Sequence, residues 1–442
     1  MFPHIIDTAY RQQLDERLIL RFATTNDLEP LAQFNGRIHG DHGQFNPFVA
    51  QWTREFASPD HPSCGPGNVT IVEDTRTGQI VSSMCSIPQT WTYDGVSFLV
   101  GRPEAVGTDP AYRRRGLIRA QFEVFHAKGE AAGQLAQVIT GIAWYYRQFG
   151  YEYAIDLSGG RGVHPSLVTP LKEGEVEPYQ LRRATVDDLP FIAPLYDRQC
   201  ARSLIACPRS TAEWRRLIDT ADNPMQFLDT YIVETGNTAQ PIGYVTCQCE
   251  LGWGQFRVSE FNVIEGQSLR AVLPAVLRRL RPVAEAAARA QGHELRGLFF
   301  QFGEQHPLFD AAPDLLPQAR PAYAWYVRVP DPPKFLNRVA PVLEARLSRS
   351  GLAGHTGEMK VSEYVRGFKL IFEGGRIRSE AWTPDDTDNA AFPPFTFNQL
   401  LFGRRSLSEL RYVYPDVGCE PEFAPVLETL FPRRPSHVLP MA

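Results

Sequence analysis

Three consecutive arginines and a glycine, Arg113–Gly116, stand where an extended apolar pattern changes to a helical one. Before them runs Ala105–Thr108, and after them Ile118, Phe122 and Phe125 recur at helical spacing. The first amides of a helix have no intrahelical acceptor and lie at the positive end of its dipole. This junction could therefore bind an anionic diphosphate, with arginines adding charge and glycine allowing close approach. A solvated basic turn is the alternative.

The wider segment Val106–Ile118 resembles the acetyl-CoA signature of the GNAT superfamily of N-acetyltransferases. That signature is an apolar strand, a D-P turn, and then R-x-x-G-x-G/A at the start of a helix. Asp109–Pro110 supplies the turn, and Arg113 and Gly116 match the motif. Ile118 departs from it, because a Gly or Ala is usual at that position.

A second stretch lies downstream at the spacing of the same superfamily. Leu135–Ile139 is typical of a strand, and Tyr145–Tyr151 is similar to the family's aromatic Y-x-x-F-G-Y motif. The first block of the chain is therefore identified as a GNAT-like domain.

The resemblance implies a direct attack of a neutral amine on the thioester of acetyl-CoA, with no metal ion. The pantetheine arm is expected to pair with the backbone of Val106 and Thr108, and the diphosphate to lie on amides from Arg114 to Ile118. The residues expected to bind the cofactor are Val106, Thr108, Arg113, Arg114, Arg115, Gly116, Leu117 and Ile118.

Two catalytic groups follow from the resemblance. Tyr146 matches the family's general acid, and a phenol of pKa about 10 can protonate a departing thiolate in a dry cleft. Packing is the alternative role for this side chain, since other tyrosines lie close by in the sequence. In the resembled family the C-terminal carboxylate helps to take the proton of the amine, and here that group belongs to Ala442.

The elements that must position these groups open in a way that recurs about 160 residues later. Leu18–Thr24 precedes Asn26–Leu28, and Tyr179–Thr185 precedes Asp187–Leu189. Each pair is typical of a short strand, a Thr/Asp helix cap and an apolar-periodic helix. This recurrence favours a duplicated domain.

The second copy lacks the residues for diphosphate binding. Phe261–Ser268 occupies the expected position between strand and helix, no R-x-x-G follows it, and Glu265 would repel a diphosphate. A degenerate GNAT-like domain without cofactor is the interpretation. The next helix carries a broad apolar face that indicates a core helix, with Leu269, Val272, Leu273, Val276, Leu277 and Leu280.

The last boundary is predicted at Val327–Pro333, which reads as a semi-rigid linker because of its prolines. Beyond it we expect a helix over Phe335–Leu347, a hairpin around Phe368–Ile377, and short helices at Leu400–Phe402 and Val426–Phe431. These elements describe a small α+β domain.

The predicted fold class is α/β, with mixed sheets, in three domains: 1–175 (catalytic GNAT), 176–330 (degenerate GNAT-like) and 331–442. This arrangement resembles the enhanced-intracellular-survival proteins, bacterial aminoglycoside N-acetyltransferases whose third domain is similar to a sterol carrier protein. That family forms hexamers, so the resemblance implies a homo-oligomer.

Composition narrows the class of partner. The chain has 442 residues, 43% hydrophobic and 21% charged, with a formal net charge of −5, which argues against a nucleic-acid binder. No apolar run reaches the roughly 18–20 residues of a membrane span. Seven cysteines without a C-x-x-C pair argue against a disulfide framework or a zinc site and favour the reducing cytoplasm.

The predicted function is transfer of an acetyl group from acetyl-CoA to an amine of a polycationic small molecule, aminoglycoside-like or polyamine. Asp41 and Glu104 are candidates for an acidic acceptor cleft, although ordinary solvation would also explain them. Phe45–Trp52 could form a wall of the acceptor pocket or a core helix. Two alternatives stay open: an apolar-ligand binding protein acting through its third domain, and an acetyltransferase for protein lysines or N-termini.

Overall fold

The computed structural model describes most of the chain. The described residues are 9–40, 43–61, 63–219, 228–249, 251–252, 254–385, 387–436 and 438–439. They form two compact units, neither of which is contiguous in sequence. One unit is drawn from Met1–Ile155 and Trp325–Arg433, and the other from Asp156–Ala324 and Arg434–Leu439. The division into three domains at 175 and 330 stays a prediction.

The first unit is built on a long mixed sheet with the strand order β1-β2-β3-β4-β5-β6-β16-β7. β5 and β6 are parallel, whereas β1 to β5 pair antiparallel. The strands are β1 (Arg11–Gln13), β2 (Leu18–Phe22), β3 (Val69–Asp74), β4 (Gln79–Tyr93), β5 (Val96–Thr108), β6 (Ala136–Ile139), β7 (Glu152–Leu157) and β16 (Tyr323–Arg328).

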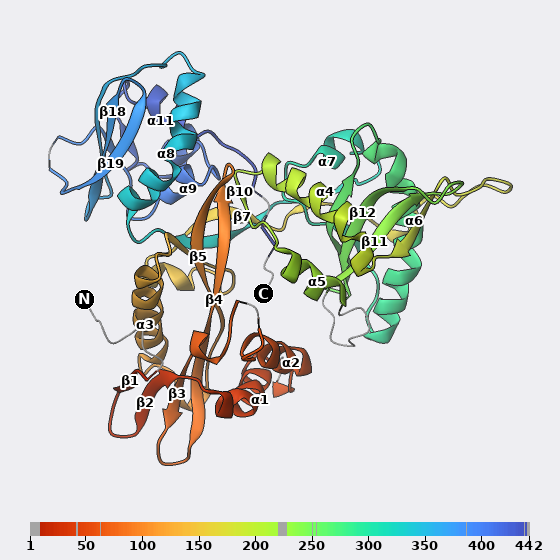
Figure 1. Ribbon diagram of the computed structural model, residues 1–442, viewed down its shortest axis with the longest axis horizontal. Coiled ribbons are helices and arrows are strands. Elements are labelled where there is room, and N and C mark those ends of the chain that lie inside the picture. Colours follow the sequence, from red (N-terminus) through yellow and green to blue (C-terminus); the bar gives the residue numbers. More distant parts are fainter. Residues whose placement is uncertain are drawn as a thin grey trace. The chain divides into compact units, whose positions relative to one another are not determined.

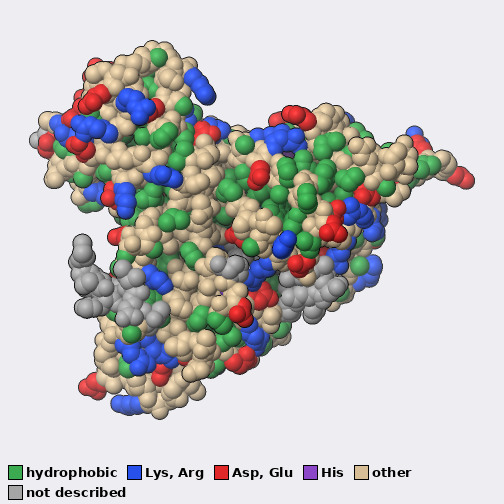
Figure 2. Space-filling model, viewed as in Figure 1, with side chains coloured by type: hydrophobic (Ala, Val, Ile, Leu, Met, Phe, Trp, Pro, Cys, Tyr) green, Lys and Arg blue, Asp and Glu red, His purple; other side chains and the backbone are tan. Residues whose placement is uncertain are grey.

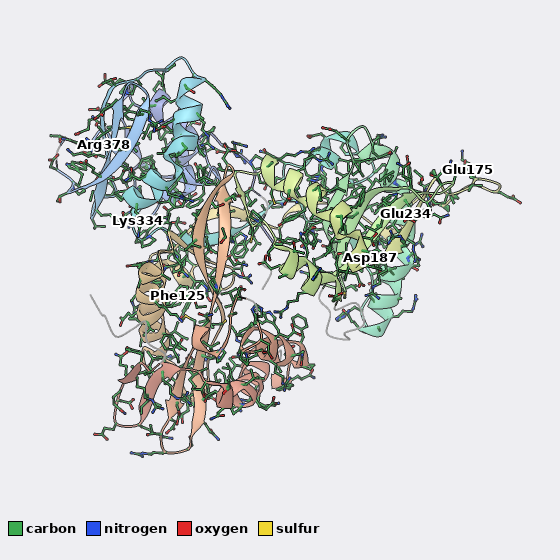
Figure 3. The ribbon with its side chains drawn as sticks, in the orientation of Figure 1. Phe125, Glu175, Asp187, Glu234, Lys334 and Arg378 are labelled. Atoms are coloured by element: carbon green, nitrogen blue, oxygen red, sulfur yellow. The ribbon has the colours of Figure 1, made fainter. Side chains whose placement is uncertain are left out.

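Helices cover both faces of this sheet (Figure 1). α1 (Leu28–Ile38) and α2 (Pro47–Phe56) lie on one face, and α3 (Leu117–Ala131) lies on the other. The alternation of strand side chains explains this arrangement, since Ile71 packs with α1 while its neighbour Val72 packs with α3. The predicted stripe on α3 is confirmed: Phe122 and Phe125, the second of which is labelled in Figure 3, are buried against the sheet.

The predicted linker at Val327–Pro333 is wrong. Val327 and Arg328 belong to β16, which lies between β6 and β7 and pairs with Val138 and Gln137 of β6. Pro332 opens α8 (Pro332–Ser348), where a missing amide hydrogen costs nothing because the first helical amides have no acceptor. The prolines therefore mark the start of a helix.

From α8 to residue 430 the chain forms the small α+β part that the sequence predicts. Its sheet has the order β19-β18-β17-β20-β21, and the predicted hairpin is confirmed as β18 (Gly367–Glu373) and β19 (Arg376–Trp382). The remaining elements are β17 (Gly357–Ser362), β20 (Ala390–Ala391), β21 (Gly418–Cys419), α9 (Phe397–Leu401), α10 (Leu407–Val413) and α11 (Ala424–Leu430). Its helix α8 packs on the β4–β5 hairpin through Arg346 and Asp94, which are 2.9 Å apart.

The second unit repeats the layered plan around a sheet of order β15-β8-β14-β13-β12-β11-β9. Its long helix α6 (Leu269–Ala290) is buried as predicted. The strands are β8 (Gly160–Val163), β9 (Tyr179–Arg183), β11 (Leu228–Thr235), β12 (Pro241–Gln248), β13 (Gln255–Val263), β14 (Gly297–Phe300) and β15 (Gln318–Arg320). The other helices are α4 (Leu189–Arg202), α5 (Thr211–Asp219) and α7 (Pro307–Ala311).

The recurring opening predicted from the sequence is present in both units. In the first, Arg21 binds Asp27 at 2.7 Å and Glu73 at 2.8 Å. In the second, Arg182 binds Asp188 and Glu234, both at 2.7 Å; Glu234 is labelled in Figure 3. Each aspartate also closes a capping box, with Thr24 in one unit and Thr185 in the other.

Basic and acidic side chains are interspersed over the face of the molecule shown in Figure 2. This distribution agrees with the small net charge of −5. Among the helices of the described residues, none has both the length and the apolar character needed to cross a bilayer.

Candidate functional site

The open edge of β5 is the first part of the site. β5 pairs with β6 only at Val100↔Ala136 and Gly101↔Gln137, so its later residues have no partner strand on that side within the described chain. A β-bulge lies in the same stretch: the register with β4 shifts between Glu104 and Gly107. Val106 sits in this bulge and Thr108 ends the strand, so an extended ligand could add its own hydrogen bonds along the edge.

The junction after β5 turns sharply into α3. Asp109 caps a single 3₁₀ turn, Pro110–Tyr112, by accepting a hydrogen bond from the amide of Ala111 at 3.0 Å. Arg114 (φ +65°) and Gly116 (φ +76°) then adopt the left-handed conformation. A Cβ added at Gly116 would meet no atom within 4 Å, so its backbone angle, and not crowding, favours glycine there. The space above this glycine is open.

The N-terminus of α3 presents unpaired amides, as predicted. Gly116 is the N-cap and offers no side chain, and the first helical hydrogen bond runs from Ala120 to Gly116 at 3.0 Å. The amides of Leu117, Ile118 and Arg119 thus find no acceptor among the described residues. Together with the helix dipole they form a site suited to an anion.

The three predicted arginines are not equivalent. Arg115 is held by Asp15 at 2.6 Å and lies over the Tyr112 ring, so its charge is partly neutralised. Arg113 reaches the Thr108 carbonyl at 3.4 Å, and Arg114 has no ion-pair partner in the described part of the chain. A fourth arginine that the motif does not include, Arg119, lies one turn into α3 and binds Gln148 at 3.1 Å. The loop therefore offers free positive charge mainly through Arg113 and Arg114.

Tyr146 lies on a short 3₁₀ helix, Tyr145–Phe149, just after β6. Its side chain is 4% exposed and packs edge-on against Phe122 and Tyr326. Its hydroxyl has no hydrogen-bond partner among the described residues, and it lies 3.5 Å from where a Cβ at Gly141 would be. A larger residue at position 141 would crowd the phenol.

Two of the neighbouring tyrosines have hydrogen-bonded hydroxyls, whereas that of Tyr145 has no partner among the described residues. The hydroxyl of Tyr151 contacts the ring of His126 at 3.1 Å, and the hydroxyl of Tyr153 accepts hydrogen bonds from the Trp144 amide and from Tyr326. Burial, followed by the charge of Glu104, raises the pKa of Tyr146 well above its usual value. Tyr146 is therefore protonated at neutral pH and free to donate that proton.

Glu104 is fixed at the bulge of β5. Its Oε1 accepts hydrogen bonds from Nε and Nη2 of Arg102 at 2.9 and 2.7 Å. Arg102 is 2% exposed and lies over the Trp325 ring, so the carboxylate cannot turn away freely. The negative charge of Glu104 contributes to raising the pKa of Tyr146, and it partly opposes the lowering of the pKa of His39 at the end of α1. Sequence reasoning proposed Glu104 only as part of an acidic wall and did not find Arg102 or His39, since neither belongs to a local motif.

Other predicted positions have mixed outcomes. Ala442 and Asp41 lie outside the described residues. The segment proposed as a pocket wall contains the start of α2, which directs Ala50, Thr53 and Phe56 into the core, while Phe45 before it is 46% exposed. The core-helix alternative therefore describes α2 itself. A separate point concerns metals: within the described ranges no cluster of three His, Cys, Asp or Glu side chains is arranged to bind a metal ion.

The corresponding junction of the second unit is closed. Ser268 caps α6 by accepting a hydrogen bond from the amide of Ala271 at 3.2 Å. Gln267 is bound to the hydroxyl of Tyr179 at 3.0 Å, and Glu265 adds negative charge just before it. This helix start has neither the arginines nor the left-handed N-cap glycine found before α3.

Comparison with known proteins agrees with this geometry. Residues 33–154 match the family model described as an acetyltransferase (GNAT) domain, and this range holds β5, α3 and Tyr146. No curated protein matches the chain in sequence.

Solved structures share the fold of almost the whole chain at low sequence identity. A GCN5-related N-acetyltransferase from Anabaena variabilis superposes with a TM-score of 0.64 at 14% identity, covering 96% of this chain and 99% of that one. One from Kribbella flavida gives 0.61 at 16% identity, with 96% and 100% coverage. Eis1 from Mycobacterium abscessus gives 0.58 at 15% identity, with 95% and 98% coverage.

The predicted mixed α/β fold class is confirmed by these superpositions. The family match covers the residues that build the open edge of β5, the uncapped start of α3 and the free phenol of Tyr146. Residues 33–154 are thus a GNAT acetyltransferase domain, and the protein is an acyltransferase.

Proposed function

We propose that the protein is an N-acetyltransferase that moves an acetyl group from acetyl-CoA to an amine of a polycationic small molecule, such as an aminoglycoside or a polyamine. The observation that carries the proposal is the continuity between the unpaired edge of β5 and the uncapped N-terminus of α3. An extended pantetheine arm could pair with the edge at Val106 and Thr108, and its diphosphate would then reach the free amides at Leu117 and Ile118.

Each residue of the proposed cofactor site has a distinct task. The backbone of Val106 and Thr108 would hold the pantetheine amides, and Arg113 and Arg114 would pair with diphosphate oxygens. We assign Arg115 a smaller part, because Asp15 already binds it. The isoleucine at position 118 projects from the helix without removing its amide, so the departure from the family motif leaves this donor in place.

The chemical step requires attack by the amine, collapse of the tetrahedral intermediate and a proton for the departing thiolate. The amine lone pair attacks the thioester carbonyl carbon, the tetrahedral intermediate collapses, and the C–S bond breaks. The free hydroxyl of Tyr146 would donate its proton to the departing thiolate, and the raised pKa of this side chain keeps the phenol protonated at neutral pH. Burial of the phenol excludes water that would otherwise compete for the proton.

The choice of a cationic acceptor rests on charge and on resemblance. Glu104 places a carboxylate at the bulge of β5, beside the position proposed for the thioester. Its Oε2, which Arg102 does not bind, could accept a hydrogen bond from an ammonium group of a polyamine. The likeness to Eis1 adds the fold alone, so the acceptor class stays part of the proposal.

A two-part experiment tests this function. Acetyl-CoA at about 100 times its Kd should stabilise the chain by ~2.7 kcal/mol, measured as a rise in Tm. Release of free CoA thiol should then be followed with aminoglycosides, polyamines and lysine peptides as acceptors. No rise in Tm would contradict the cofactor site; turnover with peptides alone would favour the protein-acetylating alternative.

Three further points belong to the proposal: the carrier alternative, the cellular location and the oligomeric state. The alternative of an apolar-ligand carrier concerns the part of the chain from α8 onward, and binding of a fluorescent fatty acid to the full chain would test it. A cytoplasmic location is favoured by seven free cysteines. The resemblance implies a homo-oligomer, such as a hexamer, which light scattering after gel filtration would test.

A further inference from the structure

His39 follows directly on α1, where this helix ends against β5. Its Nε2 lies 3.2 Å from the position that a Cβ at Gly107 would take. Cγ2 of Ile38 is nearer still, at 2.8 Å, so a side chain at Gly107 would clash with Ile38 and crowd the imidazole. The contact falls within the stretch of β5 that lacks a partner strand on its other side.

The inner nitrogen of this ring is unpaired. Nε2 of His39 is enclosed and has no hydrogen-bond partner among the described residues, whereas the side chain as a whole is partly exposed. Buried polar atoms in native proteins are nearly always hydrogen-bonded, so an unpaired ring nitrogen beside a binding edge calls for a functional reason. A ligand group on that edge would supply the missing partner.

The surroundings keep the ring neutral. Burial lowers the pKa of His39 below its usual value, and the Ala105 carbonyl and the Glu104 carboxylate only partly oppose this effect. The other charges around α1 are paired elsewhere: Arg37 with Asp109 at 3.6 Å, and Arg54 of α2 with Glu29 at 2.7 Å. A neutral imidazole has a lone pair that can accept a proton at physiological pH.

His39 and Tyr146 share one neighbour. Both side chains flank β5: His39 approaches Gly107 from the α1 side, whereas Tyr146 packs in one cluster with Val106 on the α3 side. A base and an acid that serve one carbonyl carbon must be close to the same point. Arg102 donates both hydrogen bonds to Oε1 of Glu104 and offsets the charge of the carboxylate, while Oε2 has no partner among the described residues.

We propose that His39 is the group that accepts the proton of the attacking amine. This inference rests on the proposed function. As the amine nitrogen bonds to the thioester carbonyl carbon, its proton passes to Nε2 of His39, directly or through one water. The C–S bond then breaks, the sulfur takes the proton of Tyr146, and both side chains are restored by exchange with solvent. The C-terminal carboxylate of Ala442 is then not required as the base.

The test is the pH dependence of kcat/KM for the full chain and for His39→Gln with one polyamine. In the parent protein, kcat/KM should fall below the amine's own pKa, because the neutral amine attacks, and should fall more steeply below the lowered pKa of the imidazole. In the variant, the rate at pH 7 should drop about 10²–10⁴-fold and follow the free amine, falling tenfold per pH unit below the amine's own pKa. Exposed His164 of the second unit, changed to Gln, is the matched control and should keep the parent profile.

Three further results decide the matter. Imidazole added to His39→Ala should restore part of the rate if the ring acts chemically, and an unchanged rate would overturn the proposal. So would a His39→Gln variant with the parent profile, or a loss of the acidic limb on deletion of Met441–Ala442 alone. Binding of acetyl-CoA, followed by Tm, shows that each variant is folded. Absence of turnover in the parent would instead contradict the proposed function.

Discussion

The two units begin alike and differ where α3 and α6 start. Both open with an arginine that binds an aspartate at 2.7 Å and a glutamate of a neighbouring strand. Yet α3 starts at a bare glycine with unpaired amides, whereas α6 starts at Ser268, whose side chain satisfies one of its own amides. A repeated scaffold has thus kept its framework in both places and left a site for an anion in only one of them.

The largest expected effect tests whether the chemistry belongs to the first unit. Tyr146→Phe should lower kcat by about 10²–10⁴-fold, because the departing thiolate loses its proton donor. KM for acetyl-CoA should change little, since the hydroxyl does not hold the cofactor. Tyr244→Phe removes a fully buried tyrosine hydroxyl of the second unit and serves as a control. Turnover of the Tyr146 variant near that of the parent would remove this residue from the mechanism.

The second test makes the first helix resemble the other. Gly116→Ser would place a non-glycine residue at φ +76°, at a cost of about 1–2 kcal/mol, and would fill the open space above the amides. We expect at least a tenfold rise in the Kd of acetyl-CoA, measured by calorimetry. The reverse change, Ser268→Gly, should cost only a few tenths of a kcal/mol and create no binding, because Glu265 remains. Unaltered affinity in Gly116→Ser would contradict the assigned diphosphate site.

The third test separates the arginines of the loop. Arg114→Ala should raise KM for acetyl-CoA about tenfold or more, since hydrogen bonds to charged groups contribute ~1.5–3 kcal/mol. Arg115→Ala should have the smaller effect because Asp15 already binds that side chain. Steady-state kinetics at several salt concentrations measures both. Equal losses would show that Arg115 leaves Asp15 when the cofactor binds.

The smallest expected effect concerns the capping aspartates, Asp27 and Asp188, with which both units open. Asp27→Asn and Asp188→Asn should each destabilise their own unit by about 1 kcal/mol through loss of the cap. The folded pKa of Asp27 is about 2, below its unfolded value, so its contribution is present above about pH 4 and is lost as the pH falls toward 2. The pKa of Asp188 is also lowered, which gives the same sign. Calorimetric unfolding at pH 7 and pH 3 checks both variants.

Local patterns predicted much of this molecule. The strand–cap–helix openings, the hairpin around Glu373–Arg376 and the loop at Arg113–Gly116 depend on residues near one another in sequence, and all three form as expected. Turn and cap chemistry is decided within a few residues, which is why such patterns are informative.

The features that the sequence did not predict depend on contacts between residues that are distant in the chain. Prolines near 330 are compatible with a linker and with the first turn of a helix, and only the pairing of β16 with β6 decides between them. The position of His39 on Gly107 likewise requires the sheet to be assembled. The C-terminal carboxylate of Ala442 stays a prediction.

The insertion of β16 between β6 and β7 has a consequence for biosynthesis. The catalytic sheet cannot be completed until residue 328 has left the ribosome, almost two hundred residues after β6 has been made. Until then both flanking strands present unsatisfied backbone to other chains, which exposes the nascent protein to aggregation. A shortened gene ending near residue 175 would lack β16, the strand between β6 and β7, so the transferase is expected to be inherited, expressed and engineered as one indivisible chain.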